Sequence, residues 1–86
     1  MSQSSFTIAL VQETDHGSVA ANLDACERGI LEAVAGGARL VLLQELHNGA
    51  YFCQTEDPAS FDLAESIPGP STARLGALAS KLGVVI

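Results

Sequence analysis

The chain has 86 residues, of which 48% are hydrophobic and 16% are charged, and its net charge at pH 7 is -6. This composition excludes an intrinsically disordered tail, and no apolar run is long enough to span a bilayer. An acidic chain repels a phosphate backbone, and the first residues carry no basic side chain, so we expect a cytoplasmic protein with neither a nucleic-acid nor a membrane partner.

The first half of the chain shows a strand–helix–strand pattern. Residues 6–11 form an apolar run with β-branched side chains, typical of a strand buried on both faces. Ser18 can cap a helix that ends at Gly36 and Gly37. The apolar side chains at helical spacing are Val19, Leu23, Cys26, Ile30 and Val34. Residues 40–43 form a second apolar strand, and such a βαβ unit predicts parallel strands.

The second half begins with a long aperiodic segment, residues 46–66, and loops of this length are often functional. Ser71 or Thr72 is expected to cap a second helix, after which residues 84–86 begin a third strand. A central strand needs partners for its backbone and cover for both faces. We therefore expect the N-terminal part of a longer α/β protein. The alternative is a short edge strand that closes a minimal three-stranded sheet.

Glu45 is the first candidate for chemistry. It follows the second apolar strand, at the carboxyl end where ligands gather in open α/β sheets. Burial disfavours the charged form of a carboxylate, and a carboxylate tuned in this way can act as a general base. Position alone leaves two interpretations open, a catalytic base or a polar strand end that caps loop amides or is solvated.

The residues around Glu45 resemble a catalytic motif of the nitrilase superfamily, the carbon–nitrogen hydrolases. Gln44-Glu45-Leu46 follows the strand and Tyr51-Phe52-Cys53-Gln54 follows in the loop, as in the N-carbamoylputrescine amidohydrolases of that superfamily. Other segments agree in order and spacing: Ala9 with Gln12, Asn22-Leu23, and Ile67-Pro68-Gly69-Pro70-Ser71-Thr72. The resemblance covers the whole chain but only the N-terminal part of a typical member.

The resemblance implies a fold and a mechanism. Residues 1–86 would be the N-terminal fragment of a single carbon–nitrogen hydrolase domain, the βαβαβ part of a nitrilase-type four-layer αββα sandwich. In the family, a cysteine attacks an amide or carbamoyl carbon, a glutamate takes the thiol proton and a lysine stabilises the oxyanion. For N-carbamoylputrescine the products are putrescine, CO2 and ammonia. No metal or organic cofactor is implied, and full-length members form homo-oligomers.

Glu45 matches the family's glutamate, whereas the family's lysine and cysteine lie beyond Ile86. The chain alone is therefore expected to be inactive. Tyr51, Phe52 and Cys53 are expected to line the substrate pocket, with loop anchoring as the alternative for the two aromatic residues. Cys53 has no basic residue nearby to activate its thiol, so we do not expect it to be the nucleophile.

The remaining polar residues carry weaker expectations. Cys26 is expected to be a small buried hydrophobe, and Lys81 a cation placed at a helix C-terminus. His47 is expected to be an exposed loop histidine, with a polar contact near the site as the alternative. An acidic stretch could attract a cationic amine, although a solvated loop is the simpler explanation. Its members are Glu56, Asp57, Asp62 and Glu65. The cysteines and histidines lack the spacing of a zinc site, and no phosphate-binding glycine motif is present.

Two alternatives to the amidase hypothesis stay open. The chain could be a truncated, non-catalytic member of the fold that acts as a binding or oligomerisation module through an exposed sheet. It could also belong to a related amidase of different specificity. Concentration-dependent association without activity would favour the first alternative, and residues beyond Ile86 would decide the second.

Overall fold

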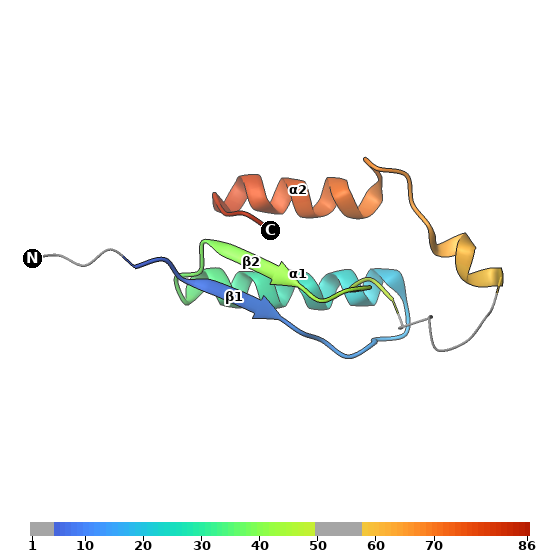
Figure 1. Ribbon diagram of the computed structural model, residues 1–86, viewed down its shortest axis with the longest axis horizontal. Coiled ribbons are helices and arrows are strands. Elements are labelled where there is room, and N and C mark those ends of the chain that lie inside the picture. Colours follow the sequence, from blue (N-terminus) through green and yellow to red (C-terminus); the bar gives the residue numbers. More distant parts are fainter. Residues whose placement is uncertain (1–4, 50–57) are drawn as a thin grey trace, which may run out of the picture.

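The computed structural model describes residues 5–49 and 58–86, which contain two paired strands, two α-helices and a short 3₁₀ helix (Figure 1). In chain order the elements are β1 (Ile8–Val11), α1 (Val19–Ala35), β2 (Leu40–Leu43), η2 (Pro58–Leu63) and α2 (Pro70–Leu82). The strands are parallel, with Ile8 opposite Leu40 and Val11 opposite Leu43. The predicted α/β class and parallel βαβ unit are confirmed. In the described part of the chain, no helix has the length and apolar character needed to cross a membrane.

Helix α1 begins and ends where its sequence pattern predicts. The Ser18 hydroxyl accepts a hydrogen bond from the Ala21 N–H at 3.1 Å, which satisfies one of the free amides of the first turn. Cys26 and Ile30, on the predicted apolar stripe, are buried. A Cβ atom at Gly29 would lie 2.6 Å from Cγ1 of Val11, so the close approach of α1 to β1 depends on a glycine there.

Helix α2 begins differently from the prediction. Its N-cap is Gly69 and its first helical residue is Pro70, whose fixed φ suits that position. The expectation that Ser71 or Thr72 caps the helix is wrong, because the backbone N–H and hydroxyl of Ser71 both bind Glu65. Gly83 ends the helix in the left-handed conformation, at φ 68°.

The third strand is present only as one parallel bridge, between Leu40 and Val85. The Val85 N–H donates to the Arg39 carbonyl at 3.0 Å, and the Val41 N–H donates to the Val85 carbonyl at 2.8 Å. The predicted βαβαβ order is thus followed, with its last strand reduced to this bridge. The segment 46–66, expected to be irregular, contains η2 in its described part.

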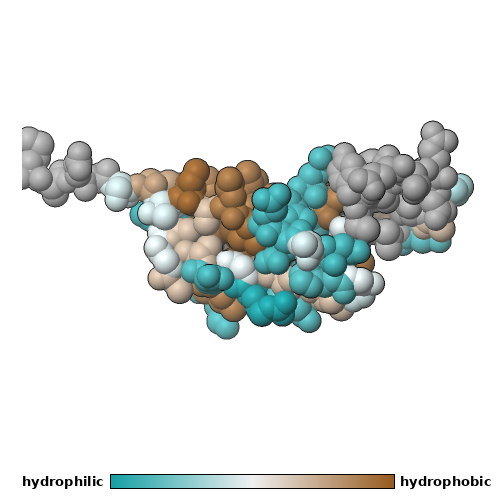
Figure 2. Space-filling view, turned by 90° about the horizontal axis from the view of Figure 1, so that it is seen from below, coloured by the Kyte–Doolittle hydropathy of each residue, from teal (hydrophilic) through white to brown (hydrophobic). Residues whose placement is uncertain are grey.

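The two faces of the strand pair differ in their cover. Val11 and Val41 pack against Ile30 of α1 and Leu78 of α2, so both helices lie on one face. The opposite face is called the open face here and carries five exposed apolar side chains: Phe6, Ile8, Leu10, Leu42 and Val85. Figure 2 shows hydrophobic surface gathered together next to polar surface. The expectation of a first strand buried on both faces is therefore wrong for this chain.

Candidate functional site

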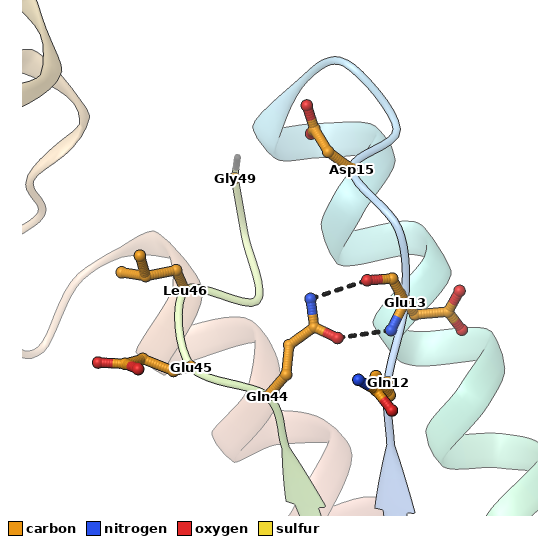
Figure 3. Close-up of a pocket in the computed structure, with 7 residues that line it drawn as sticks. All are labelled: Gln12, Glu13, Asp15, Gln44, Glu45, Leu46 and Gly49. Atoms are coloured by element: carbon orange, nitrogen blue, oxygen red, sulfur yellow. Dashed lines mark hydrogen bonds between the residues drawn. The ribbon is translucent and has the colours of Figure 1, made fainter. Parts of the chain in front are cut away.

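A pocket lies at the carboxyl edge of the strand pair. Because β1 and β2 are parallel, the residues that follow both strands meet at this edge. They surround a pocket of about 390 Å³ (Figure 3). Its lining residues are Gln12, Glu13, Asp15, Gln44, Glu45, Leu46 and Gly49. The sequence predicted a ligand site at this edge, and the pocket lies there.

Glu45 stands on a tight turn that begins directly beyond β2. Leu46 adopts φ 56°, and the Gly49 N–H donates to the Leu46 carbonyl at 3.3 Å. The Glu45 side chain is exposed and points away from the Glu13–Gln44 pair (Figure 3). The expected burial of this carboxylate is wrong within this chain, because β2 ends at Leu43 and the turn carries Glu45 out of the sheet. Among the described residues the carboxylate has no hydrogen-bond partner, so it is free to accept a proton from an incoming group.

Gln44 joins the two strand ends through its side chain. Its Oε1 accepts from the Glu13 N–H at 2.5 Å, and its Nε2 donates to the Glu13 carbonyl at 2.8 Å. The sequence identified Gln44 only as part of the motif. Its position directly after an apolar strand could have indicated these bonds, because a side-chain amide there can continue the backbone pairing beyond the last residue of the strand.

The β1 side of the pocket is organised by Asn22, which is buried in α1. Asn22 Nδ2 donates to Asp15 Oδ1 at 2.9 Å, and its Oδ1 accepts from the His16 N–H at 2.7 Å. The bond from Asn22, followed by that from the Gly17 N–H, lowers the pKa of Asp15 below its ordinary value. Asp15 therefore stays ionised to a lower pH than an ordinary aspartate does. The Oε2 atom of Glu13 lies 3.6 Å from the Nε2 atom of His16.

His47 is part of the turn that carries Glu45 and is not the exposed loop histidine that was expected. The residue is half-buried, and its Nε2 is buried with no hydrogen-bond partner within residues 5–49 and 58–86. It lines a second groove of about 440 Å³ between β2 and α2. The other lining residues of this groove are Val41, Leu42, Leu43, Gln44, Thr72, Leu75, Gly76, Ala79 and Ile86.

The acidic stretch divides into different environments. Asp62 is exposed, and Glu56 and Asp57 lie outside the described residues. Glu65 is not the solvated loop residue that was expected, because its carboxylate accepts two bonds from Ser71 at the start of α2. These bonds lower the pKa of Glu65 below its ordinary value, so the carboxylate stays ionised in mild acid.

The other candidate residues from the sequence differ in what the structure describes of them. Tyr51, Phe52 and Cys53 belong to residues 50–57, which lie outside it. Cys26 is buried as predicted, and burial raises the pKa of its thiol, which donates to the His47 carbonyl at 3.7 Å. Lys81 is in the last turn of α2, as predicted. Residues 5–49 and 58–86 contain no cluster of three histidine, cysteine or acidic side chains that could hold a metal ion.

Comparison with known proteins identifies a matching family and several similar proteins. Residues 7–86 match the family model described as carbon-nitrogen hydrolase. The chain is 40% identical over 81 residues to N-carbamoylputrescine amidase of Solanum lycopersicum, covering 93% of this chain and 27% of that protein. It is 44% identical over 69 residues to N-carbamoylputrescine amidase of Arabidopsis thaliana, covering 79% of this chain and 23% of the relative.

A further relative carries a different name. The chain is 34% identical over 80 residues to citrullinase of Francisella tularensis, covering 92% of this chain and 28% of that protein. No solved structure matches significantly. The chain thus spans about a quarter of the length of these curated relatives.

Proposed function

The chain belongs to the carbon–nitrogen hydrolase family, and we propose that it supplies the catalytic glutamate of an N-carbamoylputrescine amidase. The observation that carries the proposal is the carboxylate of Glu45, exposed and unpaired among the described residues at the edge of a pocket. It lies inside a segment that is 38% to 44% identical to N-carbamoylputrescine amidases. A general base needs this kind of access to the proton that it removes.

In the proposed reaction, Glu45 takes the proton of a cysteine thiol contributed from beyond these residues. The thiolate attacks the carbamoyl carbon, and a lysine from beyond these residues stabilises the oxyanion. The C–N bond to the terminal amino group breaks, that group takes the proton from Glu45 and leaves as ammonia, and an S-linked thiocarbamate remains on the cysteine. Water, activated by the same glutamate, attacks this thiocarbamate, and the cysteine leaves as the thiol. The carbamate that results breaks down to putrescine and CO2. In this proposal neither a metal nor an organic cofactor takes part.

The proposal treats residues 1–86 as the N-terminal part of a single larger domain. Two observations support it: the chain spans about a quarter of its relatives' length, and the open face exposes Ile8, Leu10 and Leu42. In a four-layer αββα sandwich a second sheet would cover that face. Without the lysine and cysteine the 86 residues alone would not catalyse the reaction. A cytoplasmic location and homo-oligomers of the complete protein stay predictions.

The open face also supports a second candidate function. Contiguous exposed apolar surface is typical of association sites, so a non-catalytic member of the family could use this face to bind a partner. The citrullinase relative adds a third candidate, an amidase of a different specificity.

The test uses protein expressed from the complete natural reading frame that contains this segment. We expect ammonia release from N-carbamoylputrescine, and a fall in kcat of about 100-fold or more for Glu45→Gln, the range for loss of a general base. Glu32→Gln is the matched control, since it neutralises an exposed carboxylate on α1. Full activity of Glu45→Gln would refute the assignment of the base, and citrulline serves as the competing substrate. Association without hydrolysis of either compound would favour the binding module.

A further inference from the structure

The turn that carries Glu45 is attached to the rest of the molecule at its first end by Gln44. The last registered pair of the sheet is Val11 with Leu43. Glu13 lies two residues further along, so its backbone groups face the same edge of the strand as those of Val11. The side-chain amide of Gln44 occupies that edge, accepting from the Glu13 N–H and donating to the Glu13 carbonyl at 2.5 and 2.8 Å. It replaces the backbone pairing that ends where β2 turns away.

A second amide attaches the other end of the turn. Asn48 Nδ2 donates to Glu65 Oε2 and to the Ser71 hydroxyl, both at 3.3 Å. Glu65 in turn accepts from the N–H and hydroxyl of Ser71 at 2.7 and 2.6 Å. Asn48 therefore meets Glu65 and Ser71, 17 and 23 residues further along the chain, at the N-terminus of α2, and the turn is connected to that helix.

Between these two attachments the backbone adopts a conformation that needs support. Leu46, directly after Glu45, is the one described non-glycine residue with positive φ, at 56°. Residues with a Cβ atom enter this left-handed region at a cost, and they stay there when the surrounding structure holds them. The hydrogen bond from the Gly49 N–H to the Leu46 carbonyl at 3.3 Å is long for a bond that would hold the turn by itself.

We propose that Gln44 and Asn48 are positioning residues for Glu45, two side-chain amides that hold the Glu45 turn between the end of β1 and the start of α2. The proposal rests on the proposed function of Glu45 as a base. Catalysis by a positioned base is sensitive to small displacements. The two amides thus orient, through the turn, a carboxylate that has no hydrogen-bond partner of its own among the described residues.

The first experiment examines the turn itself, in the 86-residue chain, by NMR. A protonated carboxyl at position 44 offers one O–H donor and one carbonyl acceptor, as the amide does, whereas an ionised carboxylate offers no donor. An ionised Glu at position 44 can still accept from the Glu13 N–H but cannot donate to the Glu13 carbonyl. We therefore expect Gln44→Glu at pH 7 to shift the carbonyl carbon signal of Glu13, and Gln44→Leu in addition to lose protection of the Glu13 amide against hydrogen exchange. In Gln44→Glu the carbonyl signal should return as the introduced carboxyl is protonated, and the Leu46 backbone coupling should change with it. Gln44→Leu should show no recovery at any pH.

An unchanged Glu13 carbonyl signal and Leu46 coupling in both Gln44 variants would overturn the proposal. Recovery on protonation identifies the hydrogen bonds as the cause, because a general loss of packing at position 44 would not reverse with pH. Ala77→Asp is the control for the added charge, since Ala77 is exposed on α2 and away from the turn.

The second experiment measures hydrolysis with protein from the complete reading frame. Asn48→Asp places a carboxylate beside Glu65, and we expect kcat to fall about 10- to 100-fold with KM within about twofold, as for a displaced catalytic group. Ala77→Asp should keep both constants. Wild-type kcat in Asn48→Asp and Gln44→Leu, despite a disturbed turn, would overturn the positioning role. If the wild type hydrolyses no amide at all, the proposed function fails, and with it the positioning of a base, even where the NMR result holds for the turn.

Discussion

The two faces of the strand pair are built from the same kind of residues but meet different surroundings. On β1, Val11 is 8% exposed and its neighbour Leu10 is 73% exposed. Successive side chains of a strand point to opposite faces, so this difference reflects which face the helices cover and not the apolar character of the residues. Apolar sequence on both faces therefore indicates that both are suited to burial, while the structure of these residues supplies cover for one.

The largest test of this comparison removes side-chain volume from each face. Ile30 is fully buried under the covered face, so Ile30→Ala should lower the free energy of unfolding of the protein by about 2–5 kcal/mol. Leu10→Ala, on the open face, should change it by less than about 0.5 kcal/mol. Urea unfolding followed by circular dichroism measures both. Equal losses would mean that the open face is covered in solution, for instance by a second copy of the chain.

A pair of glycines tests how tightly the covered face is packed. Alanine is favoured over glycine in a helix by about 1 kcal/mol. At Gly29 the new methyl group would meet Val11 at 2.6 Å, and overpacking of about 1–3 kcal/mol should make Gly29→Ala destabilising overall, by roughly 1 kcal/mol. At Gly76 nothing lies within 4 Å, so Gly76→Ala should be stabilising. Thermal unfolding of the two variants should shift in opposite directions, and a stabilising Gly29→Ala would contradict the close approach of α1 to β1.

The hydrogen bonds between Glu65 and Ser71 should make a pH-dependent contribution to the free energy of unfolding. The bonds from Ser71 lower the pKa of Glu65 in the folded state. The folded protein therefore binds this proton less readily than the unfolded chain, and the stabilisation is present above the unfolded pKa of roughly 4.3. It is lost as pH falls through the lower folded value. Unfolding midpoints of wild type and Glu65→Gln between pH 3 and 7 should differ at neutral pH and converge in acid. A constant difference would exclude the linkage.

The smallest effect is expected for the ion pairs between the helices. Arg74 of α2 lies 2.7 Å from both Asp24 and Glu27 of α1. The three side chains are 31%, 58% and 39% exposed, so solvent screens the pairs. We expect Arg74→Met to cost less than about 1 kcal/mol, and less still in high salt. A cost comparable to that of Ile30→Ala would show that charge, and not apolar packing, holds the cover on the sheet.

Much of the fold could be predicted because its signals are local. The helical spacing of Cys26 and Ile30, the capping hydroxyl of Ser18 and the apolar run 40–43 each act within a few residues. The start of α2 was missed because the Ser71 hydroxyl has a stronger partner in Glu65, a choice that depends on contacts between segments. The exposure of Leu10 also could not be predicted, since it depends on which elements are available to cover the sheet.

The candidate site was predicted less completely. Position and motif identified Glu45 and the edge of the sheet, but not its exposure or the turn with left-handed Leu46. The amides of Gln44 and Asn48 were missed because their partners, Glu13 and Glu65, lie 31 and 17 residues away in the sequence. The burial of Asn22 also depends on contacts with another segment, since its side chain bonds Asp15 and the His16 N–H.

Chemical labelling of the buried thiol of Cys26 can report local opening of the native structure. Cys26, in α1, is 2% exposed, and burial raises the pKa of its thiol, so an alkylating reagent can modify it only when the structure around the helix opens. Peptide mass spectrometry separates its modification from that of Cys53. The labelling rate of Cys26 against time would then measure how often the covered face opens in the native protein, without any engineered probe.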